Sequence, residues 1–216
     1  MVDTGPKEIL SVLLDFKGER VKEFCERRIR EGITPHEIFA ELSVGLDEIG
    51  TGFEGKGVTR YFTSDLIVSG RNMKRALSIL RPHFPTSGRG RGLVILGTVK
   101  GDVHDIGKMI FSVTLESNGF SCIDLGVDVD RDLFIESVAR HGPDILSLSA
   151  LLSSTLPAMG EVLDELARRG LRENLKVIVG GHAVTEEFAR EIGADAYGRD
   201  AIDGLKKCLA FVGTDR

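Results

Sequence analysis

The sequence of 216 residues has few cysteines and no surplus of basic residues, and each shortage excludes a class of protein. The three cysteines, Cys25, Cys122 and Cys208, form no Cys-x-x-Cys pair, so neither a zinc site nor a disulfide framework is expected. A net charge of −5 disfavours a nucleic-acid partner. No stretch approaches the ~18 consecutive apolar residues of a membrane span, and residues 1–6 do not resemble a secretory signal. We therefore expect a cytoplasmic protein with no nucleic-acid or membrane partner.

Hydrophobic residues make up 42% of the chain, enough for a buried core, and one segment interrupts their pattern. Residues Pro82 to Gly92 combine proline, glycine and arginine, and they neither continue a helix nor form a strand pattern. We place a domain boundary in this segment. Two domains are expected, residues 1–87 and residues 88–216.

Before this segment, apolar residues recur every three or four positions, as along one face of a helix. The expected stripes are Val12-Leu13-Phe16, Val21-Phe24-Ile29, Ile38-Leu42-Leu46-Ile49 and, within residues 63–80, Leu66-Ile67-Met73-Leu77-Leu80. Thr34, Pro35 and Glu37 form a good helix start, because Thr34 caps and Glu37 reaches back to the cap. Four helices with short connections predict a small antiparallel four-helix bundle.

After this segment, short apolar runs alternate with helical segments. The runs are 93–96, 122–125, 145–148, 177–179 and 196–197, and the helices begin near Ile106, Arg131, Leu156, Thr185 and Ala201. This alternation predicts a parallel sheet covered on both faces through right-handed crossovers. We expect an α/β, Rossmann-type domain with five strands in flavodoxin-like order.

A polar loop follows the first strand, at the edge where open α/β sheets bind their ligands. It reads Gly101-Asp102-Val103-His104-Asp105-Ile106-Gly107 and offers no run of phosphate-cradling glycines. An imidazole with a carboxylate two residues upstream is a common way to present a nitrogen ligand to a metal. For Asp105 we expect a different role, capping the helix that begins near Ile106.

Two later segments are expected at the same edge. Residues 147–155 run out of the third strand, and Gly180-Gly181-His182 follows the fourth. The succession Asp-x-His-x-x-Gly, Ser-x-Leu and Gly-Gly resembles the cobalamin-binding domain shared by methionine synthase, corrinoid-dependent mutases and the corrinoid proteins of methyltransferase systems. The resemblance covers nearly the whole chain from Leu93 onwards and implies a cobalamin or related corrinoid cofactor.

The resemblance also implies individual roles. His104 would be an axial ligand of the cobalt, and Asp102 would accept a hydrogen bond from its other nitrogen. Thr155 would extend this relay, although a helix-capping role for Thr155 is an equal alternative. No residue is assigned as catalytic.

The nucleotide tail of the cofactor would lie in a slot beside the sheet, walled by glycines that permit close approach. Ser149 and Ser153 would hydrogen-bond this tail. The complete cofactor-binding set that the resemblance implies is Gly101, Asp102, Val103, His104, Asp105, Ile106, Gly107, Ser149, Leu151, Ser153, Gly180, Gly181, Tyr197, Asp200, Ala201, Phe53 and Leu66.

The N-terminal helices resemble the helical cap of methionine synthase and of free-standing corrinoid proteins. The matching residues are Ile49-Gly50-x-x-Phe53-Glu54, Tyr61-Phe62 and Met73. The resemblance implies that Phe53 and Leu66 lie over the upper face of the corrinoid ring. Three features depart from the pattern: Thr63-Ser64 replaces Leu-Pro, the loop within 55–60 is longer, and the glutamate of the third helix has only Glu41 as an out-of-register counterpart.

The leading interpretation is a corrinoid protein that carries a methyl group on cobalt. A substrate-specific methyltransferase would load it, a second methyltransferase acting on tetrahydrofolate or coenzyme M would unload it, and a reductive activator would maintain it. The chain has no recognisable substrate pocket or nucleophile, so we expect a carrier that is not catalytic alone. Two alternatives remain: a cobalamin-responsive regulator, and a flavodoxin-like nucleotide or flavin binder in which His104 is coincidental.

Overall fold

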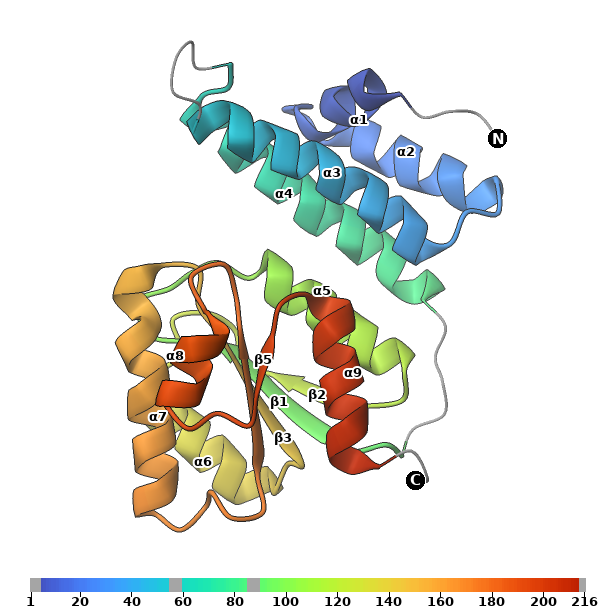
Figure 1. Ribbon diagram of the computed structural model, residues 1–216. Helices are drawn as coiled ribbons and strands as arrows, with labels where there is room; N and C mark the ends of the chain where they lie inside the picture. Colours follow the sequence, from blue (N-terminus) through green and yellow to red (C-terminus); the bar gives the residue numbers. More distant parts are fainter. Residues whose placement is uncertain (1–4, 55–59, 85–89, 214–216) are drawn as a thin grey trace. The chain divides into compact units, whose positions relative to one another are not determined.

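The computed structural model describes residues 5–54, 60–84 and 90–213. The chain divides into two compact units, residues 1–85 and residues 86–216 (Figure 1). The boundary predicted between residues 87 and 88 lies outside the described residues.

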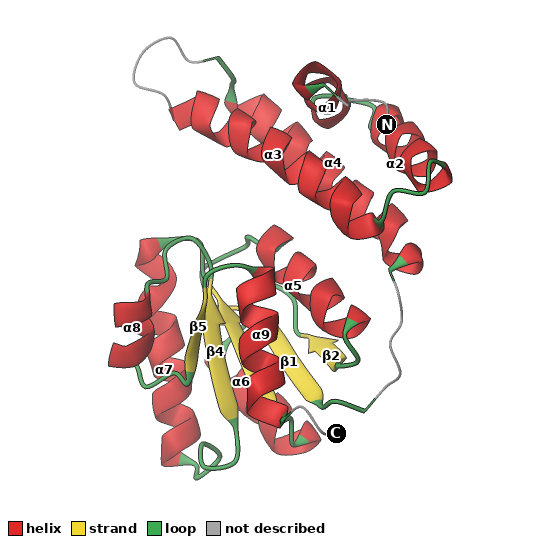
Figure 2. Ribbon diagram, turned by 45° about the vertical axis from the view of Figure 1, so that its right-hand side comes forward, coloured by secondary structure: helices red, strands yellow, loops and turns green. Residues whose placement is uncertain are grey.

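The first unit contains four helices, as predicted: α1 (Pro6–Leu13), α2 (Glu19–Arg30), α3 (Pro35–Glu54) and α4 (Thr63–Leu80), followed by a short 3-10 turn over Arg81–His83. The helices α3 and α4 lie along each other (Figure 2). Gly45 lets α1 cross α3 closely, because a Cβ at this position would lie 2.5 Å from Ile9 Cγ2. A larger residue there would push the two helices apart.

The predicted apolar stripes form the core of this unit, with two exceptions. Leu13, Val21, Ile38 and Leu42 are fully buried. One exception is Ile67 on α4, which is 67% exposed, so its predicted place in a buried stripe was wrong. The other is Phe16, which is 64% exposed. The helix α1 ends at Leu13, so Phe16 lies in the turn beyond it and does not share its buried face. The prediction for Phe16 was therefore wrong.

The predicted start of α3 is confirmed. The Thr34 amide donates to Glu37 Oε2 at 2.9 Å, and the Glu37 amide donates to Thr34 Oγ1 at 3.3 Å. This reciprocal pair satisfies two amides that the first helical turn leaves without partners.

The second unit is a five-stranded parallel sheet in the order β2-β1-β3-β4-β5, which confirms the flavodoxin-like α/β prediction. Its strands are β1 (Leu93–Thr98), β2 (Ser121–Asp124), β3 (Ile145–Ser149), β4 (Lys176–Gly180) and β5 (Ala196–Gly198). Its helices are α5 (Ile106–Ser117), α6 (Arg131–His141), α7 (Leu156–Arg168), α8 (Glu186–Glu191) and α9 (Ala201–Val212).

Helices cover both faces of this sheet (Figures 1 and 2). The helices α5 and α9 pack on one face through a core that includes Leu96, Leu115 and Cys208. The helices α6, α7 and α8 pack on the other face around Phe134 and Leu166. Burial on both faces explains why the central strands read as continuous apolar runs without alternation.

Among the helices of residues 5–54, 60–84 and 90–213, none combines the length and the apolar character that crossing a membrane requires.

Candidate functional site

The three predicted segments meet at one edge of the sheet because their strands end in register. Thr98 at the end of β1 pairs with Ser149 of β3, and Ser149 pairs with Gly180 of β4. The loops that follow these strands therefore start side by side. Parallel strands place all their carboxyl ends at the same edge, which is where this class of fold binds ligands.

Asp102 is the centre of the hydrogen-bond network at this edge, and its side chain is fully buried. Its Oδ1 lies 2.7 Å from His104 Nδ1 and accepts the His104 amide at 3.0 Å. Its Oδ2 accepts the amides of Leu151 at 2.7 Å and Leu152 at 3.1 Å. One carboxylate thus joins the loop after β1 to the loop after β3.

These contacts keep Asp102 ionised. Burial by itself raises the pKa of the carboxyl group, but the hydrogen bonds from His104, Leu151 and Leu152 outweigh it and lower the pKa from 3.8 to about 2. A charged, immobile acceptor is therefore present beside His104 at neutral pH.

The His104 ring is placed so that it can supply one nitrogen ligand to a metal. Its side chain is 47% exposed, while its carboxylate partner is fully buried. Because Asp102 can only accept, it selects the tautomer with the proton on Nδ1. The lone pair is then on Nε2, at the other side of the ring, where a metal can bind it.

Two residues differ from what a simple capping pattern predicts. Asp105 occupies the N-cap position of α5, but its side chain forms no capping hydrogen bond, so the predicted capping by Asp105 was wrong. Thr155 precedes α7 and forms no capping bond either. Its Oγ1 lies 2.8 Å from Leu152 O and 3.2 Å from Asp102 Oδ2, so of its two predicted roles the geometry favours contact with Asp102.

Thr98 is a residue of this site that was not predicted from the sequence. This buried hydroxyl donates to the His104 carbonyl at 3.0 Å and lies 2.9 Å from Ser149 Oγ. Thr98 therefore holds the main chain of His104 and also contacts Ser149, one of the two predicted serines. The sequence does contain a signal for this residue, because Thr98 is a polar residue at the end of an otherwise apolar strand, at the edge where ligands bind.

Asp128, in the loop between β2 and α6, was not predicted from the sequence either. Its Oδ1 accepts the Gly101 amide at 2.8 Å, and its own amide donates to the Asp102 carbonyl at 2.8 Å. Nothing in the spacing of the motif pointed to this residue, because it belongs to a fourth segment.

The glycines of the site fall into two kinds. A Cβ at Gly181 would lie 2.1 Å from the Ala150 carbonyl oxygen, and one at Gly180 would lie 2.9 Å from the Gly198 oxygen. The close packing of neighbouring strand ends therefore requires both of these glycines. Gly107 is different: it is exposed, lies in the first turn of α5, and a Cβ there would meet nothing within 4 Å. The fold itself does not explain this glycine.

Exposed apolar side chains lie on the same two loops that form the His104 site. Val103 is 64% exposed, Leu151 41% and Leu152 40%, and Ser153 beside them is also exposed. Large apolar residues are rarely left exposed together on a soluble domain unless a ligand or partner covers them. Exposed apolar side chains beside one nitrogen base, together with the empty space at Gly107, fit a broad, largely apolar ligand that carries a metal.

The remaining predicted residues of the second unit lie at the start of α5, in β5 and at the start of α9. Ile106 is half-buried at the start of α5. Asp200 caps α9, because its Oδ1 accepts the Asp203 amide at 2.8 Å, and Ala201 begins that helix. Tyr197 is half-buried in β5, with Lys207 Nζ 5.8 Å from its ring.

The predicted cap residues lie in the first unit. Phe53 is 37% exposed, Leu66 is half-buried, and Met73 is part of the core. Glu41 forms an ion pair with the buried Arg28 inside the first unit. The lengthened loop within 55–60 lies largely outside the described residues.

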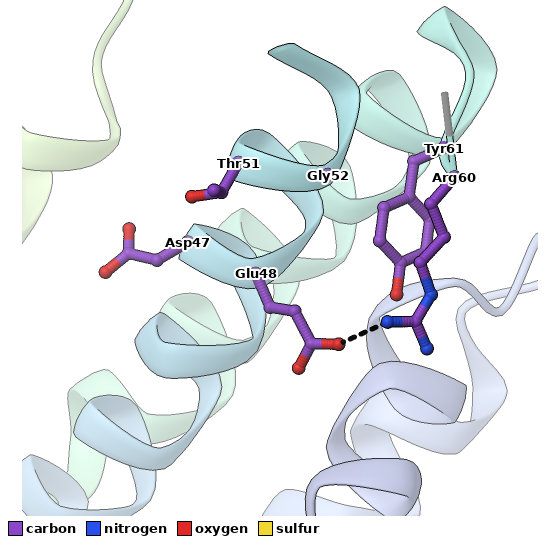
Figure 3. A pocket seen from close by; sticks show the side chains of 6 residues that line it. All are labelled: Asp47, Glu48, Thr51, Gly52, Arg60 and Tyr61. Atoms are coloured by element: carbon purple, nitrogen blue, oxygen red, sulfur yellow. Dashed lines mark hydrogen bonds and ion pairs between the residues drawn. The ribbon is translucent and has the colours of Figure 1, made fainter. Parts of the chain in front are cut away.

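A pocket of this unit lies near the end of α3 (Figure 3). Its lining residues are Asp47, Glu48, Thr51, Gly52, Arg60 and Tyr61. Glu48 points towards Arg60, with Oε1 3.4 Å from Nη1, whereas Asp47 and Thr51 point to the other side of the helix (Figure 3). None of the predicted cofactor contacts lines this pocket.

Comparisons with known proteins point to one family. Residues 92–206 match the B12 binding domain. Dimethylamine corrinoid protein 2 of Methanosarcina acetivorans is 35% identical over 204 residues, which is 93% of each chain. The structure of the Methanosarcina barkeri monomethylamine corrinoid protein is 30% identical, with a TM-score of 0.86 over 94% of this chain and 96% of that one. A chain of the methanol:cobalamin methyltransferase complex MtaBC from the same organism is 27% identical, with a TM-score of 0.55 over 98% of this chain and 81% of that one.

Proposed function

Because this chain belongs to the B12-binding domain family, we propose that it carries a methyl group on the cobalt of a bound corrinoid, between two methyltransferases. The observation that carries this proposal is the exposed ring of His104, held through Nδ1 by the buried carboxylate of Asp102 at the ligand edge of the sheet. Without this histidine-carboxylate pair, the exposed apolar residues Val103, Leu151 and Leu152 would fit many kinds of ligand.

The residues of the site fit a corrinoid. His104 would supply Nε2 to the metal, and Val103, Leu151 and Leu152 would contact the apolar parts of the ring. Gly107 would leave room for the ring at the start of α5. When bound, the corrinoid supplies a cobalt centre that accepts and releases a methyl group.

The residues behind His104 would control its proton. Asp102 would hold the imidazole in the tautomer that leaves Nε2 available to the metal, and it would keep accepting the hydrogen bond from Nδ1 with or without the metal. Thr155 contacts the far oxygen of the same carboxylate. These residues orient the ligand and hold its proton, while the methyl group itself would be moved by partner enzymes.

We extend the proposal to the nucleotide tail and to the cap. The exposed Ser153 and the glycine pair Gly180-Gly181 would contact the tail, together with Ser149. At the margin, Gly101, Asp105, Ile106, Tyr197, Asp200 and Ala201 would complete the site. In the first unit, Phe53 and Leu66 would cover the upper face of the ring.

The partners would be a substrate-specific methyltransferase that loads the protein and a second one that acts on tetrahydrofolate or coenzyme M. A reductive activator would restore the cobalt after accidental oxidation. The similar proteins are named for dimethylamine, monomethylamine and methanol, so we expect the methyl donor to be a small methylated compound.

The decisive experiment compares wild type with His104→Ala after loading with cobinamide, a corrinoid that lacks the nucleotide base. Any nitrogen ligand must then come from the protein. We expect the wild type to show nitrogen superhyperfine splitting in the EPR spectrum of cobalt(II), and His104→Ala to lose it and to bind roughly tenfold or more weakly.

The matched control is His182→Ala, since His182 is also exposed and follows Gly181 at the same edge. It should retain the splitting of the wild type. Identical spectra for wild type and His104→Ala would contradict the proposal.

A further inference from the structure

Asp128 adopts a backbone conformation that aspartate seldom takes. Its φ is +52°, and among the described residues it is the one non-glycine with a positive φ. Its side chain is 47% exposed, so burial does not force this conformation. Strained residues of this kind persist where the surrounding structure holds them, and they cluster at functional sites.

The strain does not explain why the residue is aspartate. A glycine would adopt the same φ without penalty, and the chain uses glycine with positive φ close by, at Gly101 and Gly126. The carboxylate itself must therefore have a role at this position.

The contacts of Asp128 converge on three consecutive residues that precede His104. The carboxylate pairs with Lys100, whose Nζ lies 3.4 Å from Oδ1, and it accepts the Gly101 amide at 2.8 Å. The Asp128 amide donates to the carbonyl of Asp102 at 2.8 Å. Asp128 thus holds the main chain of Gly101 and Asp102 and the side chain of Lys100 from the β2 side.

This anchor complements those on the β3 side. There, the amides of Leu151 and Leu152 hold the side chain of Asp102. Thr98, at the end of β1 itself, holds the carbonyl of His104. None of these contacts holds the Gly101 amide or the Asp102 carbonyl, and Asp128 binds both. The Asp102 amide donates to the Val99 carbonyl at 3.1 Å. The side chain of Asp102 in turn orients the imidazole.

We propose that Asp128 is a positioning residue, which holds the loop after β1 so that Nε2 of His104 meets the metal of the bound corrinoid. This inference rests on the proposed function, because it assumes that His104 is the ligand. Asp128 acts through Asp102, and no contact between Asp128 and the corrinoid is required.

The test uses the full chain loaded with cobinamide and two substitutions. Asp128→Gly removes the carboxylate and also the backbone strain, whereas Asp128→Asn keeps an acceptor for Gly101 and tolerates the positive φ. We expect Asp128→Gly to lower the ratio of imidazole-bound to unbound cobalt(II) about fivefold, as loss of one hydrogen bond of average strength does. Asp128→Asn should restore most of the wild-type ratio, read from the EPR nitrogen splitting.

A matched control separates positioning from stability. The Asp144 side chain accepts one amide, that of Leu93, at 2.8 Å at the opposite end of the sheet. We expect Asp144→Ala to lower the Tm without changing the ratio. If Asp144→Ala reduced the ratio as much as Asp128→Gly at an equal loss of Tm, the role of Asp128 would be structural and the inference would be overturned.

Two further outcomes would overturn it: a wild-type ratio in Asp128→Gly, or an equal loss in Asp128→Gly and Asp128→Asn. The His104→Ala variant distinguishes these failures from failure of the proposed function. If His104→Ala keeps the splitting, the ligand assignment fails. If it loses the splitting while Asp128→Gly does not, only the positioning role fails.

Discussion

At the scale of single residues, Asp102 shows how one carboxylate organises a site. A buried charge is costly unless hydrogen bonds replace its hydration. Here the replacement comes from two segments, His104 on one side and the Leu151 and Leu152 amides on the other. The same bonds that keep the group charged also tie the two loops together.

This arrangement predicts a pH-dependent contribution to stability. The folded pKa of Asp102 is depressed from 3.8 to about 2, so its stabilisation is fully present above pH 4 and is lost as the pH falls through 2. We expect Asp102→Asn to be less stable than wild type by on the order of 2 kcal/mol at pH 6, and by about half as much at pH 3.

Urea unfolding of the corrinoid-free protein at a series of pH values would measure this difference. Asp164→Asn, an exposed change on α7, is the control and should show no such trend. A constant difference between wild type and Asp102→Asn from pH 6 to pH 3 would argue against the depressed pKa.

At the scale of elements, the first turn of α5 contains a buried, paired lysine next to a glycine with empty space around it. Lys108 is buried and pairs with Asp124 at the end of β2, which fixes the first turn of the helix. Gly107, one residue earlier, has empty space where a Cβ would lie. A glycine in a helix costs up to about 1 kcal/mol relative to alanine, so its presence in such an open place needs a reason outside the fold.

This open space at Gly107 predicts that a larger residue would keep or raise the stability of the protein but lower its affinity for the corrinoid. Gly107→Ala should leave the corrinoid-free protein as stable as wild type, or up to about 1 kcal/mol more stable. It should weaken corrinoid binding, because the new methyl group would occupy space that we assign to the ring. Thermal unfolding and titration with hydroxocobalamin would measure the two effects.

Gly160→Ala provides the comparison on α7, since a Cβ there would make only an ordinary contact, 3.6 Å from Ile192 Cγ2. It should match Gly107→Ala in stability and bind corrinoid like wild type. Unchanged affinity in Gly107→Ala would remove this glycine from the site.

At the scale of the whole molecule, the chain consists of two units, each with its own core. The ligand edge with His104, Asp102 and their partners lies entirely in the second unit. The first unit contributes Phe53 and Leu66 only as proposed covers of the ring. Binding and protection of the corrinoid should therefore be separable.

Truncation tests this separation. A protein that starts at Gly88 should bind corrinoid and retain His104 coordination, because all residues that we assign to the lower face are present. The upper face should be less protected, so added cyanide should reach the metal faster than in the full chain. Complete loss of binding in the truncated protein would show that the first unit is part of the binding site itself.

The sequence by itself determined the elements and their order. Apolar periodicity and capping residues placed the helix starts at Pro35, Ile106, Arg131, Leu156 and Ala201, where the structure has them. Strand ends shifted by a residue or two, because strand pairing continues beyond the apolar runs through small and polar residues such as Thr98, Ser149 and Gly180. The pairing of Asp102 with His104 was also readable, since the two residues are neighbours in one loop.

Only the tertiary structure decided which distant groups complete the site. The amides of Leu151 and Leu152 carry no sequence signature, because every residue except proline has an amide. Thr98 and Asp128 join the site through the alignment of β1 with β3 and with the loop after β2, which no spacing along the chain encodes. A local motif specifies a metal ligand and its nearest partner, whereas the contacts that hold both in place arise between strands that meet only in the folded sheet.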